Sequence, residues 1–188
     1  MIMDGLLILD GTVSATGVFS GTSVNSGTTF VSGGGGTTSY NIIDVSQLGA
    51  SAKGYGRDLG IGEPLELVVM ATVSFTGSSS TLTVNLQYAP DNNGVPGSWV
   101  TVASSVAFTL TQLTLPATGM GVELMRIKLP PMTPSPATGS AMVKYIQMLY
   151  QVSAANMTAG AIAAFIVLDK TALGPGLGYQ SGYSNLYL

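Results

Sequence analysis

The sequence predicts an all-β domain, a jelly roll or β-sandwich, and three observations carry that prediction. Short runs rich in apolar and β-branched residues recur along the chain, turn residues separate them at short spacing, and no stretch shows a convincing helical period. At 188 residues the chain is predicted to form one domain over residues 1–188. A domain of this length buries roughly 70% of its unfolded surface, so a sizeable core is available.

The clearest strand is predicted over residues 81–88, TLTVNLQY, because its residues alternate strictly. One face is apolar, and the other, with Thr81, Thr83, Asn85 and Gln87, is expected to meet water or a neighbour. Residues 144–152, KYIQMLYQV, place Ile146, Met148, Tyr150 and Val152 on one side. Their second face is mixed, as expected of a strand covered on both sides. Further strands are predicted at residues 65–75, 99–103, 106–115, 122–129 and 161–169.

Turn chemistry separates these runs. Residues 76–80 and 89–97 are predicted to be hairpin connections, because Gly and Asn accept positive φ and Pro starts turns. Residues 130–140 hold four prolines and are predicted to form a long extended loop. Residues 156–158, Asn-Met-Thr, match a glycosylation sequon but are interpreted as a turn.

Two segments stand apart from the predicted scaffold. Residues 20–39 form a Gly/Ser/Thr tract that loses too much entropy on ordering to build its own core, so a flexible excursion or ordering by a neighbour is expected. Residues 173–188 form a C-terminal arm that carries Tyr179, Tyr183 and Tyr187. The arm either grips a partner through these aromatic anchors or folds back on its own domain.

Composition excludes several classes of chemistry. The chain has no Cys and no His, which removes thiolate nucleophiles, disulfides, Ser-His triads and imidazole metal ligands. Charged residues make up 8% where about 25% is usual, so little charge keeps molecules apart and assembly is expected. A net charge of −3 with scattered basic residues argues against nucleic acid. No membrane span is predicted, since the apolar run at residues 161–168 is far shorter than the ~20 residues a span needs. No signal peptide is predicted either, because the opening MIMDGLLILD has no positively charged n-region.

The glycine-rich stretch GYGRDLGIGEPL, residues 54–65, is interpreted as an architectural corner. Its spacing is one residue too long for a dinucleotide fingerprint, and it leads into a strand where a phosphate site needs a helix N-terminus. The glycines are expected to let the chain turn before Leu65 begins a core strand. Arg57 and Asp58 are expected to pair locally or to reach a neighbouring subunit.

No catalytic, cofactor or metal residues are predicted. Glu63, Glu66 and Asp58 could in principle form an acid/base pair, but a solvated rim or a salt bridge with Arg57 or Lys53 is the favoured interpretation. Asp91, Asn93 and Gly94 resemble part of a calcium loop without its downstream bidentate Glu, so a hairpin turn is expected there. The protein is therefore predicted not to be an enzyme.

Several stretches, taken in order, resemble a known family: YNIIDV at 40–45, GRDLGIGEPLELVV at 56–69, TLTVNLQYAPD at 81–91, KYIQMLYQV at 144–152 and TAGAIAAFIVLD at 158–169. They resemble the jelly-roll capsid cement, or head decoration, proteins of tailed and especially short-tailed bacteriophages. The resemblance covers most of residues 40–169. The opening MDGLLILDGTVSATG is loosely similar to the family's N-terminal strand.

The resemblance implies a structural virion protein, made in the host cytoplasm, that binds the outer capsid surface and bridges major capsid subunits to stabilise the shell. Its implied partners are the major capsid protein and further copies of itself, as a dimer or trimer, without nucleic acid or membrane. Candidate intersubunit contacts are Arg57, Asp58, Glu63, Tyr179, Tyr183 and Tyr187. The Gly-rich tract and the arm are predicted to order only in the particle. The alternative is a carbohydrate-binding or host-attachment jelly roll on the virion.

Overall fold

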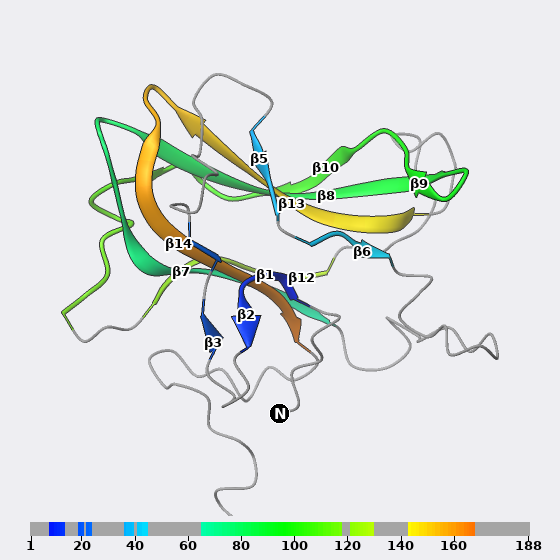
Figure 1. Cartoon of the computed structure of the whole chain (residues 1–188), viewed down its shortest axis with the longest axis horizontal. Helices are drawn as coiled ribbons and strands as arrows, with labels where there is room; N and C mark the ends of the chain where they lie inside the picture. The colour runs from blue at the N-terminus through cyan, green and yellow to red at the C-terminus, as the bar shows by residue number, and fades with distance from the viewer. Residues whose placement is uncertain are drawn as a thin grey trace, which may run out of the picture.

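The computed structural model describes residues 8–13, 19–20, 22–23, 36–39, 41–44, 65–117, 121–129 and 143–167. In this part of the chain all regular structure is β, which confirms the predicted fold class. Two curled antiparallel sheets pack face to face as a β-sandwich of the jelly-roll kind (Figure 1).

Sheet I is built around three long neighbours in the order β14 (Met157–Val167), β7 (Glu66–Gly77) and β12 (Val122–Lys128). β1 (Ile8–Asp10) and β4 (Thr22–Ser23) both pair with β14. The hairpin of β2 (Thr12–Val13) and β3 (Phe19–Ser20) forms a separate two-stranded sheet.

Sheet II is centred on β8 (Thr81–Asn92) and β13 (Val143–Ser153). Beyond β13 lie the two-residue strands β5 (Thr37–Thr38) and β6 (Ile43–Asp44). β8 is also paired by β9 (Val95–Pro96), β10 (Val100–Ser104) and β11 (Phe108–Thr109).

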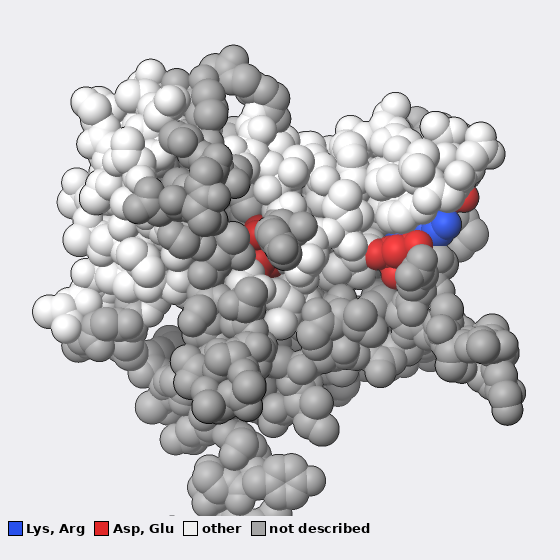
Figure 2. Space-filling model, viewed as in Figure 1, with Lys and Arg blue, Asp and Glu red and all other residues white. Residues whose placement is uncertain are grey.

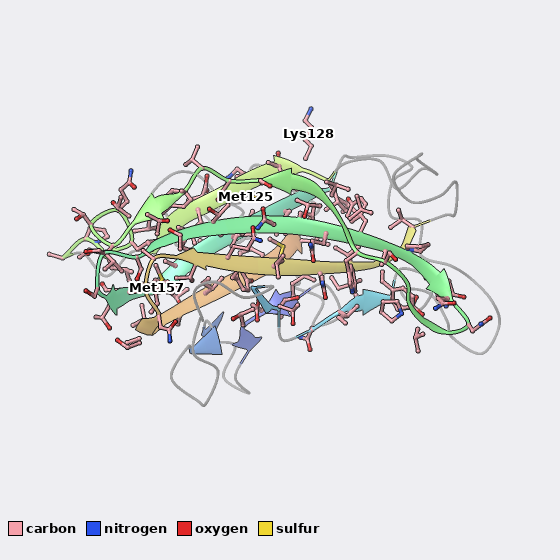
Figure 3. All side chains as sticks on the ribbon, turned by 90° about the horizontal axis from the view of Figure 1, so that it is seen from above. Met125, Lys128 and Met157 are labelled. Atoms are coloured by element: carbon pink, nitrogen blue, oxygen red, sulfur yellow. The ribbon has the colours of Figure 1, made fainter. Side chains whose placement is uncertain are left out.

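The core lies between the two sheets and follows the predicted alternation. The apolar faces of β8 and β13 are buried, and they meet the apolar faces of β7 and β14 in one cluster. Met125 and Met157 belong to this cluster, whereas Lys128 projects away from the sheets (Figure 3). The polar face of β8 departs from expectation, because Asn85 and Gln87 are buried.

The two turns that join the long strands lie at the same end of the sandwich. β7 leads into β8 through residues 78–80, and β13 leads into β14 through residues 154–156. Ser80 Oγ donates to the carbonyl of Ala155, so the two turns lie side by side. In Figure 1, β7 and β14 curve upward at the left of the view toward these turns. All four long strands therefore begin or end at the opposite end, on the right.

A glycine shapes the bend that carries β14 from one layer toward the other. Gly160 has φ +136°, and a Cβ built on it would lie 2.5 Å from Cδ1 of Phe75. The ring of Phe75 thus packs directly on the glycine backbone, which only a residue without a side chain permits. The register between β14 and β7 shifts repeatedly from Met157 to Ile162, as expected where bulges bend a strand pair.

Two segments bridge the sheets by hydrogen bonds. The first is residues 36–44: the amide of Ser39 donates to Met148 in sheet II, and the amide of Asn41 donates to Leu9 in sheet I, both at 2.9 Å. The second is residues 108–115, in which β11 pairs with β8 while the carbonyl of Leu113 accepts from Phe75 at 3.3 Å. Each bridge closes one flank of the sandwich.

Two local predictions need correction, and others concern residues that the structure does not describe. The strand predicted over residues 106–115 is wrong beyond Phe108–Thr109, because residues 110–114 turn toward sheet I as part of the second bridge. Met157 and Thr158 begin β14, so the predicted turn ends at Asn156. The corner at residues 54–64, the proline-rich loop at 130–140 and the arm at 173–188 lie outside the described residues. Of the tract at residues 20–39, the ends appear as strand residues of β3, β4 and β5.

Candidate functional site

The predicted intersubunit residues lie outside the part of the chain that the structure describes: Arg57, Asp58, Glu63, Tyr179, Tyr183 and Tyr187. Their role stays a prediction. The described residues offer a different feature, a strong separation of charge along the sandwich. We name its two halves the charged end and the uncharged end.

The charged end is the end at which β7 and β13 begin and β8 and β14 finish. Apart from the buried Asp10, the described charged residues lie there or on β12: Asp44, Glu66, Asp91, Glu123, Arg126, Lys128 and Lys144. Figure 2 shows the blue and most of the red atoms toward the right of the view, beside the β8–β9 hairpin labelled in Figure 1.

One ion cluster sits on β7 and β12. Arg126 donates to the carboxylate of Glu123 through Nε at 2.8 Å and Nη2 at 2.6 Å, and its Nη1 lies 3.9 Å from Oε2 of Glu66. The hydrogen bonds to Glu123 raise the pKa of Arg126. Glu66, a possible acid or base by sequence, is only 8% exposed and lies beside this guanidinium. A carboxylate in that position is an ion-pair partner within the strand pair.

A second ion cluster holds the β8–β9 hairpin. Oδ1 of Asp91 accepts from Lys144 Nζ at 3.0 Å, from the Tyr145 hydroxyl at 3.1 Å and from the amide of Gly94 at 3.1 Å. The Lys144 hydrogen bond lowers the pKa of Asp91. Asn93 and Gly94 have φ of +55° and +87°, as a two-residue hairpin turn requires. The predicted turn is confirmed, and Asp91 serves it as an anchor.

The uncharged end comprises the turns at residues 78–80 and 154–156 with the strands that flank them. Residues 67–90, 92–122 and 145–168 contain no Asp, Glu, Lys or Arg. Its polar groups are hydroxyls that pair across the strands: Thr76 with Thr158, and Thr81 with Ser153. Val73 is 52% exposed and Val106 71% exposed in the same uncharged stretches. The surface of the uncharged end is therefore polar but carries no charged side chain in these stretches.

A buried polar contact joins the two sheets inside the core. The hydroxyl of Tyr150, on β13, donates to Oδ2 of Asp10, on β1, and both residues are almost fully buried. Desolvation, followed by the nearby Asp10 carboxylate, raises the pKa of Tyr150 well above its usual value. Such a contact fixes how one sheet sits on the other, because either partner alone would leave a buried polar group without its bond.

The outer face of sheet II carries a row of amides and hydroxyls. Gln147 donates to Gln87 at 2.8 Å, and Gln87 donates to Thr101 at 3.2 Å, so one chain of bonds crosses β13, β8 and β10. Asn85 donates to Gln151 and accepts from Ser104. These residues fix the alignment of three strands, and their mutual pairing explains why a polar face can be buried.

The described residues contain no group of three or more acidic, His or Cys residues placed to hold a metal ion. In the same residues, no helix is long and apolar enough to cross a bilayer.

Sequence reasoning missed the pairs Asp91–Lys144, Glu66–Arg126 and Asp10–Tyr150. Each joins residues far apart in the chain, and each depends on strand register or on how the sheets stack. Periodicity predicts which face a residue occupies, but it does not predict which residue lies opposite on the next strand. The uncharged stretches, by contrast, are visible in the sequence.

One family model, described as Bbp16, matches residues 34–166. No curated protein matches the chain. The matched residues run from just before β5 almost to the end of β14 and include the long strands of both sheets. The phage-related part of the sequence resemblance is thereby confirmed. Since the match covers well over half of the sequence, the chain belongs to the Bbp16 family and is a phage-related structural protein.

Proposed function

We propose that the protein is a capsid cement protein, which binds the outer surface of a phage head and bridges neighbouring major capsid subunits. The observation that carries this proposal is the exposed uncharged end on a member of a phage-related family. Val73 is exposed in a stretch without charged residues, so a partner that covered it would bury no charge of this chain. The low fraction of charged residues in the sequence likewise predicts assembly with partners.

The uncharged end suits repeated contact with a protein shell. Hydroxyl groups both donate and accept hydrogen bonds, so they can pair with varied backbone and side-chain groups. Covering them requires no ion to be stripped of water, which is the main cost of burying charged surface. The charged end, held by its own ion pairs, is then left toward solvent.

Stabilisation follows from binding that favours the assembled shell. A protein that binds a site formed by two capsid subunits, and binds neither subunit alone, shifts the equilibrium toward the assembled state by mass action. Weak contacts suffice, because icosahedral symmetry repeats them over the whole head. Copies that also contact each other would add effective concentration.

The proposal is tested by mixing the purified protein with undecorated capsids and heating them. We expect co-sedimentation with the capsids and a higher disruption temperature. A protein that neither binds nor raises this temperature is not a cement protein. Binding of a glycan array without affinity for capsids would assign it to host attachment.

Two matched substitutions locate the contact. Val73→Lys places a charge on the uncharged end, and Val95→Lys places one on the β8–β9 hairpin at the other end, where the valine is 55% exposed. We expect Val73→Lys to weaken capsid binding about tenfold or more, because an unpaired charge would be buried, and Val95→Lys to bind as the unmodified protein does. The reverse pattern would place the contact at the charged end.

A further inference from the structure

The tip of the β8–β9 hairpin holds the only Asn-Gly pair of the sequence, Asn93-Gly94. Asn92 pairs with Val95, so Asn93 and Gly94 are the two residues of the turn. An asparagine followed by glycine is prone to deamidation, because no side chain on the glycine hinders attack by its backbone nitrogen. Both turn residues are exposed, so water reaches them. The hairpin tip is therefore a candidate site of covalent modification.

The reaction joins the side chain of Asn93 to the main chain. The amide nitrogen of Gly94 loses its proton to a base in the solvent and attacks Cγ of Asn93. A new N–C bond forms, the bond from Cγ to the side-chain nitrogen breaks, and ammonia leaves after taking a proton from the solvent. Water then opens the cyclic succinimide at either carbonyl. The net reaction consumes one water, releases one ammonia and leaves aspartate or isoaspartate, which has an extra methylene in the main chain.

The folded turn keeps the two reacting groups apart. Asn93 and Gly94 have φ of +55° and +87°, as in a type I′ hairpin turn. In the ideal form of that turn, ψ of the first central residue is about +30°, which sets the next nitrogen nearly anti to Cβ across the Cα–C bond. Attack on Cγ requires this nitrogen and Cβ to lie on the same side of that bond. The turn must therefore open before the ring can close.

Asp91 opposes the reaction in a second way. Its Oδ1 accepts the amide proton of Gly94 at 3.1 Å, and this is the proton that must leave before attack. Its loss would place negative charge on the nitrogen beside a carboxylate, which Coulomb repulsion disfavours. Lys144 and Tyr145 donate to the same oxygen and hold the carboxylate in place. The Lys144 hydrogen bond also lowers the pKa of Asp91, which makes it a poor base for that proton.

We propose that Asn93 is a latent deamidation site, which the turn and its Asp91 anchor keep unreactive, so that modification marks chains in which the β8–β9 hairpin has opened. Both products disfavour reclosure. Isoaspartate lengthens the main chain of a turn of two residues, and either product adds a carboxylate close to Asp91, where like charges repel. Deamidation is therefore a one-way record of opening. The site belongs to the chain itself and does not rest on the proposed function.

Peptide mapping of the full chain by mass spectrometry tests the site. The protein is kept in mildly alkaline buffer, either folded or unfolded in guanidinium chloride, and conversion of Asn93 is followed with time. We expect conversion to be about tenfold or more faster in the unfolded chain, the factor that a hydrogen bond to a charged group is worth. The other asparagines, none followed by glycine, serve as internal references. Equal rates in the folded and unfolded chain would overturn the proposal.

Two matched carboxylate substitutions test the anchor. Asp91→Ala removes it, and Glu123→Ala removes a carboxylate of the other ion cluster; the two side chains are 44% and 46% exposed. Folded Asp91→Ala should deamidate about tenfold faster than the unmodified protein, because the bonds from Gly94 and Lys144 are lost, and Glu123→Ala should react at the unmodified rate. Circular dichroism melting confirms that both variants fold. An unchanged rate in Asp91→Ala, or equal acceleration in both variants, contradicts the role of the anchor.

The cyclic route has its own control. Gly94→Ala should lose most of the reaction in the unfolded chain, because the added methyl group hinders attack by the backbone nitrogen. Isoaspartate should appear among the products of the unmodified chain, since direct hydrolysis of the side chain gives aspartate alone. Aspartate as the sole product, formed equally fast in Gly94→Ala, would exclude ring closure and with it the protection that the turn provides.

Discussion

At the scale of single residues, Gly160 carries the most specific structural demand. Its φ of +136° and the ring of Phe75 at contact distance both exclude a side chain. Gly94 offers a natural comparison, since it has φ +87° but no atom within 4 Å of where a Cβ would stand. Comparing alanine substitutions at the two glycines therefore separates the loss of stability caused by backbone strain from the loss caused by a steric clash.

We expect Gly160→Ala to lower the free energy of unfolding by about 3 kcal/mol, from backbone strain plus overpacking against Phe75. Gly94→Ala should cost only about 1 kcal/mol, because strain acts there alone. Urea denaturation of the two variants measures both values. Equal losses would show that the Phe75 contact contributes little.

The roles of the two glycines are not equally predictable from the sequence. Asn93-Gly94 between two strand patterns predicts a hairpin turn directly. Gly160 stands in an apolar stretch that reads as continuous strand, and only the position of Phe75, on another strand, explains it. Local turn chemistry is therefore predictable, whereas a close approach between distant strands is not.

At the scale of elements, the first bridge depends on one small side chain. Oγ of Ser39 accepts from the amide of Met148 at 3.0 Å and donates to the carbonyl of Asn41 at 2.8 Å. Ser39 is buried, and its two hydrogen bonds stabilise the segment that carries the chain from β5 toward sheet I.

Ser39→Ala should lower the free energy of unfolding by about 2 kcal/mol, because the buried amide of Met148 loses its partner. Hydrogen exchange should speed up at Met148 and in β1, which the bridge holds. Ser98→Ala, at an exposed serine, is the control and should change stability by less than about 0.5 kcal/mol. Unchanged exchange in Ser39→Ala would show that backbone bonds alone hold the bridge.

The second bridge shows where element prediction fails. Residues 106–115 read as a strand because their apolar and polar residues nearly alternate, yet residues 110–114 turn so that Leu113 can enter the core fully buried. Packing of one leucine between sheets outweighs the local preference for an extended chain. The predicted strands that the structure confirms at β7, β8, β12 and β13 have buried apolar residues that belong to the core.

At the scale of the whole molecule, buried tyrosines link stability to alkaline pH. Desolvation raises the pKa of both Tyr88 and Tyr150 in the folded protein. Above pH 10 these groups ionise in the unfolded chain but stay protonated in the fold. The unfolded state then binds fewer protons, so stability is complete below pH 10 and falls as the pH rises beyond it.

We expect the free energy of unfolding to fall above pH 10 and Tyr150→Phe to flatten that decline by about 1.4 kcal/mol per pH unit, one proton's worth. At neutral pH the same variant should be less stable by about 2 kcal/mol, because Asp10 loses a buried donor. Denaturation at a series of pH values measures both effects. An equally steep decline in the variant would assign the effect to other tyrosines.

The charge separation along the sandwich was only half predictable. The uncharged stretches and the phage-related family could be read from the sequence, and both hold. That these stretches meet at one end follows from hairpin topology, which brings residues 78–80 beside residues 154–156. The predicted contact residues lie in the glycine-rich corner and the C-terminal arm, outside the described residues, whereas the proposed function depends on Val73, an ordinary residue whose exposure only the structure shows.

Because the two long-strand turns occupy the uncharged end, the other connections of the chain are anchored at the charged end, and this affects where the chain can be lengthened. The segments that join residues 44 to 65 and 129 to 143 both leave from the charged end and return to it, and β14 also finishes there. Doubling such a segment costs only about 0.6 kcal/mol in closure entropy, because its anchor points stay fixed. New peptide can therefore be grafted at that pole while the opposite pole keeps its shape, which makes this sandwich a natural frame for displaying foreign sequence.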